Sequence, residues 1–215
     1  PQNQGDLLKT VSMKVELSAI DQSLKSFITN GTGIGYNESI GHHMIEHVEL
    51  LIGGQVIQRL TSDFIHIYSE QYTTQTKQHN LEKLIGKPPL EFSGTMVMST
   101  ALGHYLGNAT SDTKYFIDIP FYFYNNPELS VPLCAITGQE IEIVLKLRDV
   151  DQCIHATRTG VAHVNFIHYT GLKPKNLIKS LKINVEMVSL DEEEKQMLLS
   201  RKIDYTITQI QESID

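Results

Sequence analysis

Residues 43–47, with the sequence HMIEH, carry side chains that can do metal chemistry. They match the pattern H-x-x-E-H, in which two histidines ligate zinc and the glutamate activates a water molecule. That chemistry requires a helix, whereas His47 continues directly into VELLIGGQVI, which is typical of a β-hairpin. In a strand, His43 and His47 would lie about 13 Å apart, too far to share one ion. No third ligand is evident, so we interpret the segment as a polar strand edge or loop.

The remaining chemistry-bearing residues form no recognisable active site. No His-x-His pair of the kind that jelly-roll cupins use for metal is present, and the other histidines are scattered: His66, His79, His104, His155, His163 and His168. The sequence contains no G-x-S-x-G, no G-x-x-x-x-G-K-[ST], no G-x-G-x-x-G and no C-x-x-C. We therefore predict no enzymatic activity, no catalytic residue, no metal site and no cofactor. A metal-dependent enzyme stays as an alternative, which zinc analysis would test.

Three N-glycosylation sequons begin at Asn30, Asn37 and Asn108. All three fall in expected loops. Because the first residues show no signal-peptide pattern, we interpret the three sequons as chance matches.

Charge and cysteine content narrow the class of protein further. The formal net charge is -7, which argues against a nucleic-acid-binding protein because such proteins usually carry a basic face. No apolar run reaches the length of a transmembrane helix. Cys134 and Cys153 do not form a disulfide framework, and we expect two reduced thiols, although one bridge between them stays open.

Apolar residues recur at every second position in several segments, which is typical of strands with one buried and one solvated face. Antiparallel sheets tolerate such strands, and parallel sheets mostly do not. The same period also occurs in residues 181–187. We expect one apolar set to line the inner faces of a barrel: Val11, Met13, Val15, Ile141, Ile143 and Leu145.

Turn and helix signals divide these strands. Gly53-Gly54 predicts a tight hairpin turn within residues 48–60, and Asn125-Asn126-Pro127 predicts a turn after an aromatic strand, with residues 129–149 as its hairpin partner. A helix is expected to start near Ser62 or Asp63, and a short turn at NLEKLIG. The spacing of Ser189 and Glu192 predicts a capped helix over 190–200. Many strands with few short helices in the connections indicate an all-β protein with an antiparallel sandwich or barrel.

Residues 48–70, 117–149 and 189–212, taken in this order, resemble the double jelly-roll major capsid proteins of nucleocytoplasmic large DNA viruses. The opening NQGDLLKTVSMKVELSAI is similar to an early strand of that family. The specific parts are the IGGQ turn and the IPFYFYNNPELSVPL block. They supply a structural signature of Gly53, Gly54, Gln55, Pro120, Asn126, Pro127 and Pro132.

The resemblance implies a fold and a role in assembly. Residues 1–188 would form the first jelly-roll barrel, with its first strand missing. Residues 189–215 would form a linker helix, carrying Leu190, Glu194, Met197 and Leu198, and the start of a second jelly roll. A strand at 203–211 would lack its partners.

Family members form homotrimers with a pseudo-hexagonal outline, which tile an icosahedral shell. The implied partners are further copies of the chain, neighbouring capsomers and minor or cement capsid proteins. The resemblance implies no direct contact with nucleic acid. It also implies no membrane span, even where the shell overlies an internal membrane. The implied location is the virion, after assembly in the host cytoplasm. Two alternatives are a single jelly-roll capsid subunit of the penton type and a carbohydrate-binding jelly-roll module. The latter would need exposed aromatic and acidic side chains on one set of loops.

Overall fold

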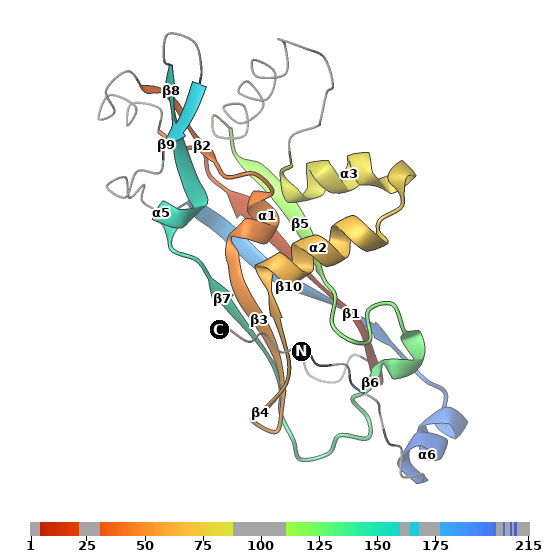
Figure 1. Ribbon diagram of the computed structural model, residues 1–215. Coiled ribbons are helices and arrows are strands. Elements are labelled where there is room, and N and C mark those ends of the chain that lie inside the picture. Colours follow the sequence, from red (N-terminus) through yellow and green to blue (C-terminus); the bar gives the residue numbers. More distant parts are fainter. Residues whose placement is uncertain are drawn as a thin grey trace.

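The computed structural model describes residues 5–21, 31–87, 111–159, 164–167 and 177–200, together with residues 204, 207 and 209 (Figure 1). In these parts of the chain, no helix is both long enough and apolar enough to cross a membrane. The strands that they contain pair in antiparallel fashion.

One sheet has β1 (Leu7–Leu17) at its centre. β1 pairs with β10 (Ile178–Val188) on one edge and with β5 (Thr113–Ile119) on the other, and the short β6 (Val131–Pro132) pairs with the start of β1. Val11 lies opposite Val185 on β10 and Ile119 on β5, so the apolar faces of the three strands coincide.

The other strands form two three-stranded sheets. One has the order β4 (Gln55–Thr61), β3 (Ile45–Ile52) and β7 (Ile141–Leu147). The other has the order β2 (Gly31–Tyr36), β8 (Ile154–Thr159) and β9 (Val164–Ile167). Figure 1 shows β3, β4 and β7 lying in front of β1 and β10 as the second layer of a sandwich.

The core lies between these layers, and its residues confirm the predicted inner faces. The side chains of Val11, Met13 and Val15 are fully buried. The half-buried Ile141, Ile143 and Leu145 pack against the same cluster, while Val144 on the opposite face of β7 is exposed. The described strands form the all-β antiparallel sandwich that the alternation predicted. The alternation of β10 is less complete, because Ile183 is exposed.

The predicted hairpin between the aromatic strand and residues 129–149 is wrong. β5 pairs with β1, β6 also pairs with β1, and β7 pairs with β3 in the other layer. The physical reason is that Pro120 has no N–H to continue a ladder. The chain then turns, and Phe121 and Phe123 are buried in the core. The segment crosses between the layers and does not fold back on β5.

Short helices occupy the connections. They are α1 (Ile40–His43), α2 (Ser62–Tyr72), α3 (Gln75–Ile85), α5 (Val150–Cys153) and α6 (Glu192–Ser200), with a 3-10 turn η3 at Pro127–Leu129. α2 starts where predicted, and the Thr61 hydroxyl accepts a hydrogen bond from the Phe64 N–H at 3.4 Å. The short turn expected at NLEKLIG is the second half of the 11-residue helix α3.

Gly86 ends α3 and holds the helix close to β5. Its φ of +79° is a left-handed conformation that few other residues adopt. A Cβ built on Gly86 would lie 2.7 Å from the Tyr115 ring and 3.0 Å from Ile40. This close approach places the α2–α3 pair beside β5, as Figure 1 shows.

Candidate functional site

The two histidines of the H-x-x-E-H motif belong to different elements. His43 ends α1, and its Nε2 lies 2.9 Å from the Gln152 carbonyl. His47 lies in β3, where its Nδ1 is 3.1 Å from the Arg59 guanidinium. The predicted polar strand edge is wrong for His47, which is largely buried. Within the described ranges, no three His, Cys, Asp or Glu side chains are grouped so that they could hold a metal ion.

Asn37, the start of one sequon, is part of a hydrogen-bond network with residues of α1, α5 and β8. Its Nδ2 donates to the Gln152 carbonyl at 2.6 Å and lies 3.0 Å from His43 Nε2. Its Oδ1 lies 3.0 Å from His155 Nδ1. Ser39, the third sequon residue, is buried with a left-handed φ of 51°. Asn37 therefore ties three segments together, whereas the sequons at Asn30 and Asn108 lie outside the described residues.

A second histidine pair joins α1 to α2. His42 Nδ1 and His66 Nδ1 are 3.1 Å apart, and the rings meet edge to face with centroids 5.4 Å apart. Burial and the neighbouring His66 lower the pKa of His42 to about 4. At neutral pH His42 is therefore uncharged, as a buried ring requires. Sequence analysis missed this pair because nothing local marks two histidines that are 24 residues apart.

The glycines of the structural signature shape a hairpin tip. Gly53 and Gly54 have φ of +59° and +79°, as the β3–β4 turn requires. The Gly53 N–H donates to the Glu140 carbonyl at 2.8 Å, which connects the tip to the segment before β7. Gln55 is exposed and begins β4.

The other signature residues shape the crossing between layers. Pro120 directly follows β5, and Asn126 and Pro127 begin η3, where the Asn126 side chain donates to the Tyr122 carbonyl at 3.4 Å. Pro132 lies in β6 opposite Leu7. Pro120 therefore lies at the end of a strand, Pro127 in a 3-10 turn, and Pro132 in a short strand that pairs with the start of β1.

The helix predicted over 190–200 is present as α6, but its cap differs from the prediction. Asp191, not Ser189, caps α6, since the Glu194 N–H donates to Asp191 Oδ1 at 2.8 Å and the Asp191 N–H donates to Glu194 Oε2 at 3.4 Å. Leu190 lies before the helix, and its N–H donates to Asp6 Oδ2 at 2.8 Å. Lys195 lies 3.2 Å from the same carboxylate.

α6 presents apolar side chains on two sides. Met197 and Leu198 line a shallow pocket with Leu7 and Leu190. Met197 and Leu199 are nonetheless 55% and 59% exposed. No residue of α6 is buried. The helix is thus held mainly through Asp6, and its remaining apolar surface has no cover from the described residues.

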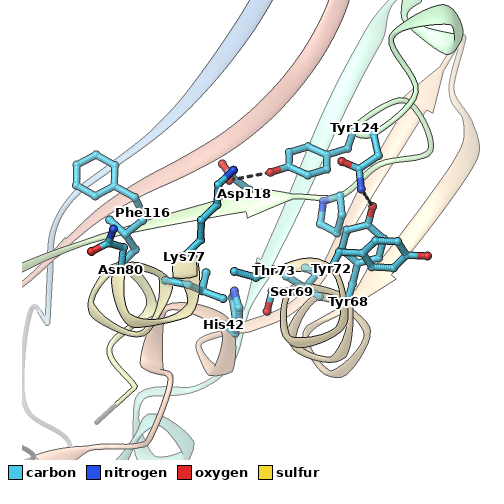
Figure 2. A pocket seen from close by; sticks show the side chains of 15 residues that line it. His42, Tyr68, Ser69, Tyr72, Thr73, Lys77, Asn80, Phe116, Asp118 and Tyr124 are labelled. Atoms are coloured by element: carbon cyan, nitrogen blue, oxygen red, sulfur yellow. Dashed lines mark hydrogen bonds between the residues drawn. The ribbon is translucent and has the colours of Figure 1, made fainter. Parts of the chain in front are cut away.

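A hollow of about 550 Å³ lies between α2, α3 and the end of β5 (Figure 2). Three tyrosines form one side of it. The rings of Tyr68 and Tyr72 stack with centroids 4.3 Å apart, and Tyr124 meets Tyr68 edge to face at 6.4 Å. Burial and the Asp118 carboxylate raise the pKa of Tyr124, whose hydroxyl donates to Asp118 Oδ2 at 2.9 Å.

Both cysteines are free thiols, as expected. Burial raises the pKa of Cys153 to about 11. A thiol that stays protonated is a poor nucleophile, so Cys153 acts as a small apolar side chain of the core.

Viral capsid proteins are among the solved structures that resemble this fold. VP54 of PBCV-1, in a crystal structure fitted into a reconstruction of the virophage Sputnik, superposes with a TM-score of 0.65 at 17% identity, over 98% of this chain and 42% of VP54. The Faustovirus major capsid protein gives a TM-score of 0.62 at 12% identity, over 94% of this chain and 52% of that protein. The fold is therefore the jelly roll of large DNA virus capsid proteins.

The sequence matches the family of the major capsid protein N-terminus over residues 2–191, and the chain belongs to that family. The "Major capsid protein" of Phaeocystis pouchetii virus is 25% identical over 222 residues, covering 96% of this chain and 41% of the relative. "Capsid protein 1" of Acanthamoeba polyphaga mimivirus is 27% identical over 217 residues, covering 96% of this chain and 33% of the relative. The chain thus spans less than half the length of these curated relatives.

Proposed function

We propose that this chain is the N-terminal jelly roll of a major capsid protein that builds the icosahedral shell of a large DNA virus. The observation that carries the proposal is the family match over residues 2–191, on a chain that folds as a jelly roll. Shell building requires complementary surfaces and no reaction chemistry. The histidines of the H-x-x-E-H motif support a structural role, because each is engaged in contacts between segments.

The proposed assembly unit is a homotrimer with a pseudo-hexagonal outline. Its partners would be copies of itself, neighbouring capsomers and minor or cement capsid proteins, in a virion assembled in the host cytoplasm. The net charge of -7 supports a protein that makes no direct contact with nucleic acid.

We also propose a domain boundary, with the first barrel at 1–188 and a linker helix and the start of a second jelly roll at 189–215. The exposed Met197 and Leu199 support this boundary, since a helix with so much uncovered apolar surface is stabilised by a further packing partner. The greater length of the relatives supports it too. Most of the strand expected at 203–211 lies outside the described residues. Gln209 is one of the described residues of this segment, and its side-chain amide donates to the Ile57 carbonyl at 3.0 Å.

Electron microscopy with native mass determination of the full-length protein, purified from its natural source, tests the proposal. We expect trimers or closed shells of pseudo-hexagonal units, built from a polypeptide more than twice the length of this chain, given the coverage of the relatives. A stable monomer that forms neither trimers nor shells would contradict the proposed function.

A further inference from the structure

We propose that the hollow between α2, α3 and β5 binds a neutral saccharide. This site goes beyond the shell-forming role, because it gives the capsid protein a ligand-binding function of its own. The hollow, about 550 Å³, falls within the usual size range of small-ligand pockets.

The aromatic side of the hollow, which we call the tyrosine wall, consists of Tyr68, Tyr72 and Tyr124. Tyr72 stands at the end of α2 and is 66% exposed, with one face of its ring stacked on Tyr68. Figure 2 shows Tyr68 and Tyr72 next to each other on one side of the pocket. The C–H faces of a pyranose ring pack well on an exposed aromatic face, because the face is apolar and carries partial negative charge.

The tyrosine wall is held in place before any ligand arrives. The Asn125 amide donates to the Tyr68 hydroxyl, and the Tyr124 hydroxyl donates to Asp118. Ring stacking between Tyr68 and Tyr72 restrains both further. A site whose side chains are already ordered loses less conformational entropy on binding, which favours weakly interacting ligands such as sugars.

The rest of the lining is mixed, with polar side chains from α3 and β5 beside the apolar Leu81, Leu84 and Phe116. Asn80 and Lys77 project from α3, and Asp118 projects from β5 (Figure 2). A carboxylate and a carboxamide are planar groups that can each form two hydrogen bonds with neighbouring hydroxyl groups. An aromatic wall with such groups beside it matches a ligand that has C–H faces and a rim of hydroxyls.

The charge of the lining favours a neutral ligand. At neutral pH the charged side chains among the described lining residues are Lys77 and Asp118, one of each sign. His42, which also contributes to the lining, is uncharged at that pH. An anionic or cationic ligand would therefore find no net counter-charge in the hollow.

The main alternative is an extended peptide that docks against the tyrosines. The packing of α3 against β5 argues against it, because peptide recognition requires a run of anchoring contacts along a strand edge or a groove. Here Gly86 holds α3 directly against β5, so the helix covers part of that strand edge.

The test uses the full-length, assembled capsid protein and a panel of cellotriose, chitotriose, maltotriose and mannotriose. Binding is measured by saturation-transfer NMR and titration calorimetry. We expect at least one trisaccharide to bind, and Tyr72→Ala and Asn80→Ala each to raise its Kd about tenfold or more. Ile67→Ala is the matched control, because Ile67 is an exposed α2 residue (53%) that does not line the hollow. It should leave the Kd unchanged.

A second set of titrations uses neutral oligosaccharides released from the purified virion. Tighter binding of these than of the panel would identify a glycan of the particle itself as the source, and the reverse would indicate a glycan outside the particle. Loss of binding with unchanged trimer assembly separates this site from the proposed shell function. Any of three results would overturn the proposal. These are that no saccharide binds, that Ile67→Ala and Tyr72→Ala have equal effects on the Kd, or that only proline-rich peptides compete for the hollow.

Discussion

The side-chain oxygen of Gln58 accepts a hydrogen bond from the backbone N–H of Tyr122 at 2.8 Å. Gln58 lies in β4, whereas Tyr122 lies in the turn that follows β5, so the bond joins the two layers where the chain leaves the first sheet. Gln58 is almost fully buried. A polar side chain in this position is stable only because its hydrogen bonds to water are replaced by bonds to the protein.

Replacing Gln58 by Leu should therefore destabilise the barrel. The variant keeps the volume but leaves the Tyr122 N–H without this acceptor, which costs about 1–3 kcal/mol. Denaturant unfolding measures the loss. Gln55→Leu, at the exposed start of the same strand, should change the stability by less than about 0.5 kcal/mol. Similar losses for both variants would show that the bond between the layers contributes nothing specific.

Gly86 and Gly138 form a matched pair for testing the approach of α3 to β5. Both have positive φ, +79° and +78°, but a Cβ at Gly138 meets nothing within 4 Å, whereas one at Gly86 meets the Tyr115 ring at 2.7 Å. Gly138→Ala should cost about 1–2 kcal/mol from backbone strain alone. Gly86→Ala should cost about 1–3 kcal/mol more because of overpacking. Equal unfolding free energies for the two variants would refute the close contact.

The local patterns in the sequence predicted individual strands well, but not how they pair. The alternation of Val11, Met13 and Val15 specifies which face of β1 is buried, and Gly53-Gly54 specifies a turn, because both signals act over a few residues. Pairing of β7 with β3 depends on packing between residues about 100 positions apart. The Asn125–Pro127 turn signal is real, but the buried Phe121 and Phe123 lead the chain into the opposite layer.

The candidate sites show the same limit. Two acidic capping patterns overlap at the start of α6, Ser189 with Glu192 and Asp191 with Glu194, and local sequence does not choose between them. The choice is consistent with a distant residue, since Asp6 binds the Leu190 N–H and keeps that residue outside the helix. The i, i+4 spacing of Tyr68 and Tyr72 indicates only that both lie on one face of a helix. The polar partners of the tyrosine wall come from β5, α3 and the turn at Asn125, which local sequence does not bring together.

The buried His42 should make the fold sensitive to acid. Its pKa is lowered from 6.5 to about 4 in the folded chain, so the unfolded chain takes up this proton first as the pH falls. The stability contribution is complete above about pH 6.5 and is lost between about pH 6.5 and 4, by roughly 3 kcal/mol. Unfolding free energies measured across this range should fall less steeply in His42→Gln. An unchanged slope would mean that other groups govern the acid response.

Asn37 should carry no glycan in the mature protein. Its Nδ2, the atom that a glycan would modify, donates to the Gln152 carbonyl at 2.6 Å, and Ser39 of the same sequon is buried. Mass spectrometry of the peptide that contains Asn37 should find it unmodified. Asn37→Asp should also lower the stability by about 1–3 kcal/mol, because the carboxylate cannot donate to that carbonyl. A glycopeptide at Asn37 would contradict the network described here.

Asp6 should control whether α6 stays on the barrel. Its carboxylate accepts from the Leu190 N–H at 2.8 Å and lies 3.2 Å from Lys195 Nζ, and these partners lower its pKa. In Asp6→Asn the charge attraction to Lys195 is lost, and in Asp6→Ala both contacts are lost. We expect amide hydrogen exchange of residues 192–200 to rise in the order wild type, Asn, Ala, while exchange in β1 stays slow. Because the pKa of Asp6 is lowered in the folded chain, acidification should detach the helix as the pH falls through that pKa.

Glu193→Gln, on the exposed side of the same helix, is the control and should leave the exchange rates close to wild type. Fast exchange in the wild type at neutral pH, equal to that of Asp6→Ala, would show that Asp6 does not hold the helix.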